Sequence, residues 1–284
     1  MFRFSFALIL FLTYSFGTGA QSLVVQHFQS DSRWNYHLAL LELALTNTAA
    51  TDGSYLLKDS HADVSQKRGL AFLAKGESVN IAFLVANRER EANFLSIKLP
   101  TLKGLLGYRI AIIRKSDQRS FENIETLDQL RTEFTAGFGA HWADMEILKF
   151  NRIPVVGAAV YKNLFAMLSK GRFQYFPRGI SEIWNEVTER KESHPDLSVE
   201  NKIALYYPYV VYFYVNKNNQ KLADRIERGL NMALENGDFK KLFLKFHQDS
   251  IEKSNLQNRK MFILKNPTLP PNIEFSDTSW WLTQ

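Results

Sequence analysis

The chain has 284 residues, of which 45% are apolar and 23% are charged, and it contains no cysteine. This ordinary globular composition excludes a wholly disordered or collagen-like chain, and the lack of cysteine excludes thiolate catalysis, cysteine-ligated zinc and disulfides. The net charge is only +6 and the basic residues form no run, so we expect no nucleic-acid partner.

Residues 1–20 have the pattern of a secretory signal peptide. Arg3 supplies a positive charge before an apolar stretch over residues 4–16, and Thr18-Gly19-Ala20 forms a small-residue cleavage site. The stretch is shorter than the roughly 20 residues that a membrane span needs, although an uncleaved anchor is the alternative. We therefore expect cleavage after Ala20, no stable membrane insertion afterwards, and a monomeric protein in the periplasm.

Strand-like and helix-like patterns alternate along the rest of the chain, which predicts an α/β fold with mainly parallel sheets. The expected strands cover residues 23–25, 55–57, 79–85, 109–113, 134–138, 154–156, 173–176 and 206–215. The expected helices cover residues 66–74, 126–130, 161–168 and 181–190, with others beginning near residues 31, 140, 222 and 238. Gly76 and Gly171 are expected to end helices, and the proline-rich residues 266–281 to pack as an extended strap.

Several stretches of the chain resemble a known family. Residues 90–109, residues 171–179, Tyr207-Pro208 with residues 212–217, and the helical region 222–243 carry the resemblance. Together they are similar to the type II periplasmic solute-binding proteins of family 3, which is amino-acid-binding-like. The similarity is greater still to an orphan proteobacterial branch described as transporter substrate-binding-domain proteins. The resemblance extends from about residue 24 to residue 271.

The resemblance implies two α/β lobes that are joined by two hinge strands and close around a ligand. Residues 21–110 and 211–284 would form lobe 1, residues 111–210 would form lobe 2, and the hinges would lie near 108–114 and 207–215. The implied function is solute capture for a transporter, with a membrane permease as partner. A ligand sensor with a signalling partner is the alternative.

We expect no enzymatic activity, although a few proteins with this fold are dehydratases or belong to cell-wall enzymes. An acid or base in the cleft would have to come from His141, Asp31 or Glu200, and no pair of them is arranged by the sequence. The six histidines show no metal-ligand spacing, and no phosphate-binding or dinucleotide motif is present. We therefore expect neither a metal nor a cofactor.

Two arginines are the sharpest candidates for ligand contact. The resemblance places Arg90 where family members clamp a ligand carboxylate, and a guanidinium suits that role because its paired N–H groups match two oxygens. The alternating charges over residues 88–91 also fit a solvated helix face. Arg178 follows a strand end, where α/β proteins collect ligands, but it is also four residues before Glu182. We expect the two arginines to share a small anionic, carboxylate-bearing ligand across the cleft.

Other candidates lie at two strand–helix junctions. Gly139 allows close backbone approach before a helix, with His141 and Trp142 directly after it, although a plain turn and a core tryptophan explain the same residues. At the first junction, Asp31 and Tyr36 are expected to face the cleft, although Asp31 is first of all a residue that caps the helix.

The signal peptide leads to a direct prediction. The mature protein should begin near Gln21 and be recovered free of the membrane, because the apolar stretch is too short to anchor it. Intact-mass measurement of a periplasmic extract checks this, and a full-length product in the membrane fraction would contradict it.

Overall fold

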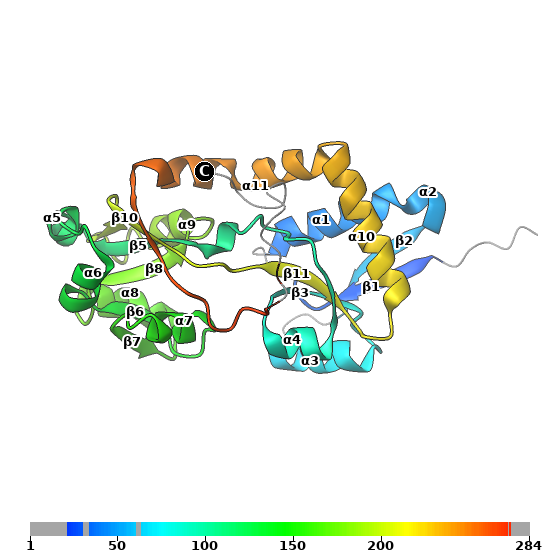
Figure 1. Ribbon diagram of the computed structural model, residues 1–284, viewed down its shortest axis with the longest axis horizontal. Helices are drawn as coiled ribbons and strands as arrows, with labels where there is room; N and C mark the ends of the chain where they lie inside the picture. The colour runs from blue at the N-terminus through cyan, green and yellow to red at the C-terminus, as the bar shows by residue number, and fades with distance from the viewer. Residues whose placement is uncertain (1–21, 31–33, 61–63, 272, 274–284) are drawn as a thin grey trace, which may run out of the picture.

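Two α/β lobes lie side by side along the long axis of the molecule, and several chain segments pass between them (Figure 1). The computed structural model describes residues 22–30, 34–60, 64–271 and 273. The arrangement confirms the predicted two-lobed α/β fold class. The sheets are mixed, because β5 and β11, the strands next to the passages between lobes, run antiparallel to their neighbours.

Lobe 1 contains two small sheets that lie edge to edge. Its strands are β1 (Leu23–His27) paired with β2 (Tyr55–Asp59), and β3 (Ile81–Val85), β11 (Val211–Val215) and β4 (Leu95–Ile97) in the order β3-β11-β4. The Asn80 N–H donates to the Gln26 carbonyl over 2.9 Å, and the Gln29 side chain bonds both the N–H and the carbonyl of Phe83. These bonds join the two sheets. The helices of this lobe are α1 (Asn35–Asn47), α2 (Ala49–Asp52), α3 (Gln66–Lys75), α4 (Arg88–Asn93), α10 (Gln220–Glu235) and α11 (Asp238–Ser254).

Lobe 2 is built on one seven-stranded sheet with the order β12-β10-β5-β8-β6-β7, in which β9 also pairs with β5. Its strands are β5 (Tyr108–Arg114), β6 (Ala136–Gly139), β7 (Val155–Ala158), β8 (Tyr175–Gly179), β9 (Leu197–Val199), β10 (Ile203–Tyr206) and β12 (Lys260–Ile263). Its helices are α5 (Gln118–Glu122), α6 (Leu127–Glu133), α7 (Asp144–Phe150), α8 (Tyr161–Ser169) and α9 (Ile183–Glu189). Short 3₁₀ turns occur at η2 (Leu105–Gly107), η3 (Lys115–Asp117) and η4 (Leu256–Asn258).

Local sequence signals set several helix ends as predicted. Helix α3 ends at Gly76, which has a left-handed backbone with φ 69°. Helix α6 begins at Thr126, whose side chain accepts from the Gln129 N–H, while the Gln129 side chain accepts from the Thr126 N–H. The start of the first helix at Asp31 lies outside the described residues.

The predicted single strand over residues 206–215 is wrong, because it divides into β10 and β11, which belong to different lobes. Pro208 lies between them and has no N–H to donate to a strand ladder. Residues 207–210 thus form a passage between the lobes. A second difference concerns β12, which pairs in parallel with β10 and so belongs to the sheet of lobe 2, whereas the sequence grouped residues 211–284 with lobe 1.

The two passages predicted from the sequence run next to each other. The chain leaves lobe 1 at Gly107 and returns at residues 207–210. A Cβ atom on Gly107 would lie 2.2 Å from the Tyr207 carbonyl oxygen, a distance that no side chain tolerates. The rings of Tyr108 and Tyr206 lie 4.6 Å apart beside it. Glycine at 107 is therefore required for the close approach of the two passages.

In the part of lobe 1 that the structure describes, three histidines are buried and have at least one ring nitrogen without a hydrogen-bond partner: His27, His37 and His247. His37 of α1 stacks on Phe83 with ring centroids 5.5 Å apart, and neither of its nitrogens has a hydrogen-bond partner among the described residues. The ring centroids of His247 of α11 and Tyr36 lie 4.6 Å apart, and the Nε2 of His247 has no hydrogen-bond partner in the described part of the chain. Burial lowers the pKa of His37 to about 3, helped by His247, and lowers the pKa of His247 to about 4.

These pKa values predict acid sensitivity. Below about pH 6.5 the imidazoles of His37 and His247 become protonated in the unfolded chain but stay neutral in the folded protein. The stability present at neutral pH is therefore lost as the pH falls toward 4. Each histidine should contribute a slope of up to about 1.4 kcal/mol per pH unit. Denaturant unfolding of the wild type and of His37→Leu at pH 7, 6 and 5 checks this. His37→Leu should have a shallower slope than the wild type, and equal slopes in the two proteins would contradict the prediction.

Candidate functional site

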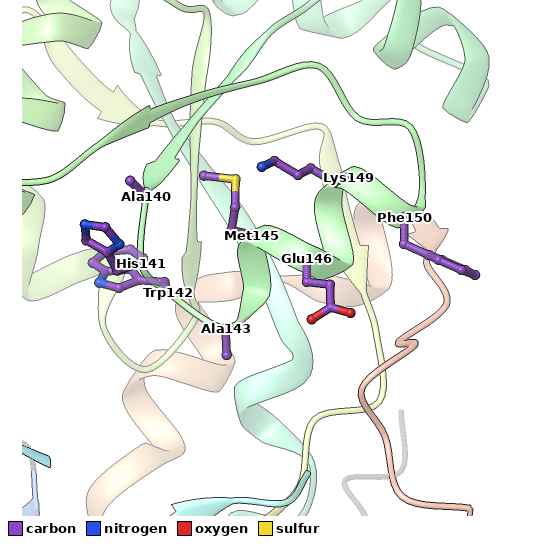
Figure 2. Close-up of a pocket in the computed structure, with 8 residues that line it drawn as sticks. All are labelled: Ala140, His141, Trp142, Ala143, Met145, Glu146, Lys149 and Phe150. Atoms are coloured by element: carbon purple, nitrogen blue, oxygen red, sulfur yellow. The ribbon is translucent and has the colours of Figure 1, made fainter. Parts of the chain in front are cut away.

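An open pocket of about 600 Å³ lies where β6 passes into α7. Residues 140–143 of the connecting turn and Met145, Glu146, Lys149 and Phe150 of α7 line it. Figure 2 shows His141 and Trp142 together on the turn, with Lys149 and Phe150 extending from the far end of the helix. In Figure 1, α7 lies on the side of lobe 2 that faces lobe 1, and every residue that lines the pocket belongs to lobe 2.

Gly139 allows the turn to fold back over the end of β6. A Cβ atom at this position would lie 2.3 Å from the Trp142 indole. The indole is half-buried, packs edge-on against Phe138 with centroids 5.0 Å apart, and is stacked over Phe176 at 6.2 Å. Trp142 thus joins the core of lobe 2 on one side and the pocket on the other, whereas His141 is exposed in the pocket wall.

Arg178 stands at the end of β8 and is already paired. Its Nε and Nη2 donate to the two carboxylate oxygens of Glu186 over 2.7 and 2.6 Å, and Nη2 lies 3.1 Å from Glu182. Burial opposes the charge on Arg178, but these two carboxylates outweigh it and raise the pKa of the guanidinium. The guanidinium also lies 4.8 Å from the Trp142 ring centroid. The pairing with Glu182 was an alternative in the sequence, whereas Glu186, one helical turn further on, was missed.

A second buried cluster, which we call the hinge cluster, was not foreseen. It consists of Arg109, Asp144, Tyr207 and Tyr209. Asp144 accepts hydrogen bonds from Arg109 Nη2 at 2.7 Å, from the Tyr207 hydroxyl at 2.5 Å and from the Tyr209 hydroxyl at 2.6 Å. Asp144 is only 6% exposed, so it lies in the interior and not on a solvated face of α7. Burial and, after it, the Asp144 carboxylate raise the pKa of Tyr209. Burial also raises the pKa of Tyr207, where Arg109 lowers it and Asp144 raises it.

Glu182 connects the two clusters. Its carboxylate lies 3.1 Å from Arg178 and 3.8 Å from Arg109, and it accepts from the Gly179 N–H over 3.3 Å. Two arginines are therefore shared among the three carboxylates of Asp144, Glu182 and Glu186, as the contacts above show. Both arginine charges in this wall of lobe 2 are compensated from within the protein.

Arg90 of α4 stands in a different environment. Its N–H donates to the Asn87 side chain over 2.8 Å, and its Nη1 donates to the Val85 carbonyl over 2.5 Å. It is half-buried, and no carboxylate of the described part of the chain lies within salt-bridge distance of it. Burial lowers the pKa of Arg90, while the phenol groups of Tyr209 and Tyr214 and, after them, the more distant Glu89 carboxylate act in the opposite direction. Arg90 is thus a largely desolvated cation that lies near the returning passage.

The neighbours of Arg90 are occupied or exposed. Glu91 accepts from the Tyr214 hydroxyl over 2.6 Å and from the Ser96 hydroxyl over 3.0 Å, so its carboxylate serves lobe 1. Arg88, two residues before Arg90, is exposed to solvent. The solvated-face interpretation therefore fits Arg88 but does not fit Arg90.

The remaining predicted residues fall elsewhere. Tyr36 is 3% exposed and its hydroxyl donates to the Thr101 carbonyl over 2.6 Å, so it packs in the core of lobe 1. Asp31 lies outside the described residues. Glu200, a candidate acid for the enzyme alternative, is fully buried, accepts from the N–H groups of Lys202 and Ile203, and pairs with Arg259 at 3.3 Å. Its bonds hold the start of β10 in lobe 2.

Across residues 22–30, 34–60, 64–271 and 273, no group of three or more histidine, aspartate or glutamate side chains is placed to hold a metal ion. In the same residues, no helix combines the length and the apolar character that a bilayer crossing requires.

Comparison with known proteins identifies the fold. No protein-family model matches the chain, and no curated protein matches it. Among solved structures, an amino acid ABC transporter substrate-binding protein from Streptococcus pneumoniae bound to L-arginine has 17% identity and a TM-score of 0.53. The match covers 81% of this chain and 96% of that one. The GluR0 ligand-binding core from Nostoc punctiforme, in complex with L-glutamate, has 17% identity and a TM-score of 0.51 over 79% of this chain and 98% of that one.

A histidine kinase sensor domain with similarity to periplasmic binding proteins matches at 13% identity and a TM-score of 0.53, over 80% of this chain and 96% of that one. At these identities the likeness concerns the fold. The chain therefore has the two-lobed fold of the periplasmic binding proteins.

The buried pairing of Arg178 leads to a stability prediction. Arg178→Ala should lower the free energy of unfolding of the ligand-free protein by about 3–5 kcal/mol, because Glu186 is left as a buried carboxylate without its partner. The matched change Arg88→Ala, at an exposed site, should stay within about 0.5 kcal/mol of the wild type. Denaturant unfolding measures both, and an unchanged midpoint for Arg178→Ala would show that the pair carries no stability.

Proposed function

We propose that the chain is a periplasmic solute-binding protein that captures a small carboxylate-bearing solute between its lobes. The observation that carries this proposal is the guanidinium of Arg90, which is half-buried and has no carboxylate partner within the described chain. A desolvated cation of this kind favours an anion that enters beside it, since charge-assisted hydrogen bonds gain strength where water is excluded.

The position of Arg90 supports a role in the cleft. Helix α4 lies on the side of lobe 1 that faces lobe 2, across from α7 and its pocket (Figure 1). A guanidinium matches the two oxygens of a carboxylate with parallel N–H groups, which makes it selective for planar anions. L-Arginine and L-glutamate, bound by two of the structural neighbours, both carry such a carboxylate.

On lobe 2 we propose that Gly139, His141 and Trp142 form the opposing wall. Arg178 holds that wall in place, because Glu186 fixes its guanidinium and the guanidinium in turn supports the Trp142 ring. The original expectation of two free arginines sharing one anion is therefore modified: Arg90 is the anion anchor, and Arg178 acts through Trp142. Glu182, with 37% of its side chain exposed, is available for a positive group on the same solute.

We further propose that the protein is exported after loss of its signal peptide, stays monomeric, and delivers its solute to a membrane permease. It is assigned to the orphan proteobacterial branch on the sequence stretches described above. Sensing is the second candidate function, and it is favoured by the match to a histidine kinase sensor domain. Solute uptake in cells that lack the protein separates the two, since a transport component is needed for uptake and a sensor is not.

The anchor role of Arg90 is testable with a panel of small carboxylates that includes L-arginine and L-glutamate. A ligand at 100 times its Kd should raise the free energy of unfolding by about 2.7 kcal/mol, which thermal shift detects. For any ligand found, Arg90→Lys should weaken binding about tenfold or more, because an ammonium loses the paired hydrogen bonds.

Arg88→Lys is the matched control, since it makes the same change two residues away at an exposed position and should leave affinity unaltered. Equal affinities for Arg90→Lys and the wild type would remove the proposed anchor. A ligand that lacks any anionic group would overturn the proposed solute class.

A further inference from the structure

The C-terminal part of the chain makes a connection between the lobes that is separate from the two passages at Gly107 and residues 207–210. After β12, residues 264–271, which we call the strap, lead from lobe 2 back to lobe 1. In Figure 1 this red segment runs from the β10 side of lobe 2 across the middle of the molecule toward α4. The proline-rich sequence predicted an extended strap here, and the contacts along it are specific.

On lobe 2, the strap is fixed at two consecutive residues. The Leu264 N–H donates to the Tyr206 carbonyl over 2.7 Å, which continues the β12–β10 ladder, and the Leu264 side chain is buried. Lys265 and Asn151 then exchange a pair of bonds: the Lys265 N–H donates to Asn151 Oδ1 over 2.9 Å, and Asn151 Nδ2 donates to the Lys265 carbonyl over 2.7 Å. Asn151 ends α7, so the strap is bound to the pocket helix.

At the centre, the strap is bound to the returning passage. Asn266 Nδ2 donates to the Pro208 carbonyl over 2.8 Å. Asn266 Oδ1 accepts from the N–H and the hydroxyl of Thr268 over 2.9 and 2.8 Å. These side-chain bonds fold residues 266–268 into a turn. The strap therefore holds spare length at the level of the passage between the lobes.

On lobe 1, the strap ends in an apolar contact. Leu269 and Ile273 pack against the cluster that contains Phe28, Leu84 and Phe94, and Pro270 between them is buried. This contact and the Lys265–Asn151 pair belong to different lobes. Three residues lie between Lys265 and Leu269, so the four Cα-to-Cα steps between the two anchors span at most about 14 Å when fully extended.

We propose that the strap is a third link between the lobes and limits their relative motion. Any rotation of one lobe against the other must either release an anchor or open the turn that Asn266 holds. Opening the turn lengthens the link only to the four extended Cα-to-Cα steps between Lys265 and Leu269. This length limits how far the two lobes can move apart while both anchors hold. The proposal rests on the fold and on these contacts, and it holds whichever ligand the cleft takes.

The distance between the lobes tests the proposal. Because the chain has no cysteine, Lys162→Cys on α8 and Lys221→Cys on α10 give one labelling site in each lobe. Pulsed electron spin resonance on the spin-labelled, ligand-free protein then measures the distribution of distances. The double change Asn266→Ala with Leu269→Ser removes the turn and the lobe 1 anchor, and it should broaden the distribution.

The control is Ile263→Ser, which alters a 73% exposed side chain directly before the strap and should leave the distribution as in the wild type. A second variant carries a protease recognition sequence after Thr268, so that cutting the folded protein breaks the link while keeping β12 in place. Broadening after the cut supports the proposal even where the double variant is poorly folded. An unchanged width in the cut protein, with its melting transition intact, would overturn the proposal.

Discussion

The carboxylate of Asp144 is the interaction on which the arrangement of the lobes depends. It accepts from Arg109 at the start of β5, and from Tyr207 and Tyr209 in the returning passage. One buried acid thus ties both covalent passages to the N-terminal end of α7. Each donor is desolvated together with it. Removal of the acid would take away the partner of the Tyr207 and Tyr209 hydroxyls and leave Arg109 with Glu182 at 3.8 Å, and such networks lose more than a single bond when broken.

This network also determines which charges remain for a ligand. In lobe 2, Arg109 and Arg178 form ion pairs with Asp144, Glu182 and Glu186. The wall that they support is aromatic and contains one more carboxylate than guanidinium groups. In lobe 1, Arg90 keeps its charge without a carboxylate partner in the described chain. The proposed site is therefore asymmetric, with its cation on one lobe and its structural ion pairs on the other. Arg90 and Arg178 are the same type of residue, and their proposed roles differ because Arg178 is paired with carboxylates and Arg90 is not paired with one in the described chain.

The features predicted correctly from the sequence are those with local causes. Gly76 ends a helix because its own backbone adopts the left-handed conformation, and Thr126 caps one through Gln129 three residues away. The fold class followed from the alternation of elements and from the family resemblance. The role of Asp144 was not predicted, because its partners lie 35, 63 and 65 residues away and no local pattern identifies them.

The division between β10 and β11 and the placement of β12 had the same cause. An apolar run over residues 206–215 fits one strand equally well, and only the sheets on either side decide where it breaks.

The membership of β12 in the lobe 2 sheet has a consequence for how the chain reaches its native state. The sheet is complete only when Lys260 meets Ile203, and lobe 1 likewise needs β11 beside β3, where Val211 meets Val85. Both lobes therefore need strands that are synthesised late. Neither lobe is one continuous stretch of chain that could fold as it leaves the ribosome. When strands far apart in the sequence pair, the chain loses loop-closure entropy before the stabilising contacts form, and this slows folding. A chain assembled in this order stays unfolded for longer during synthesis.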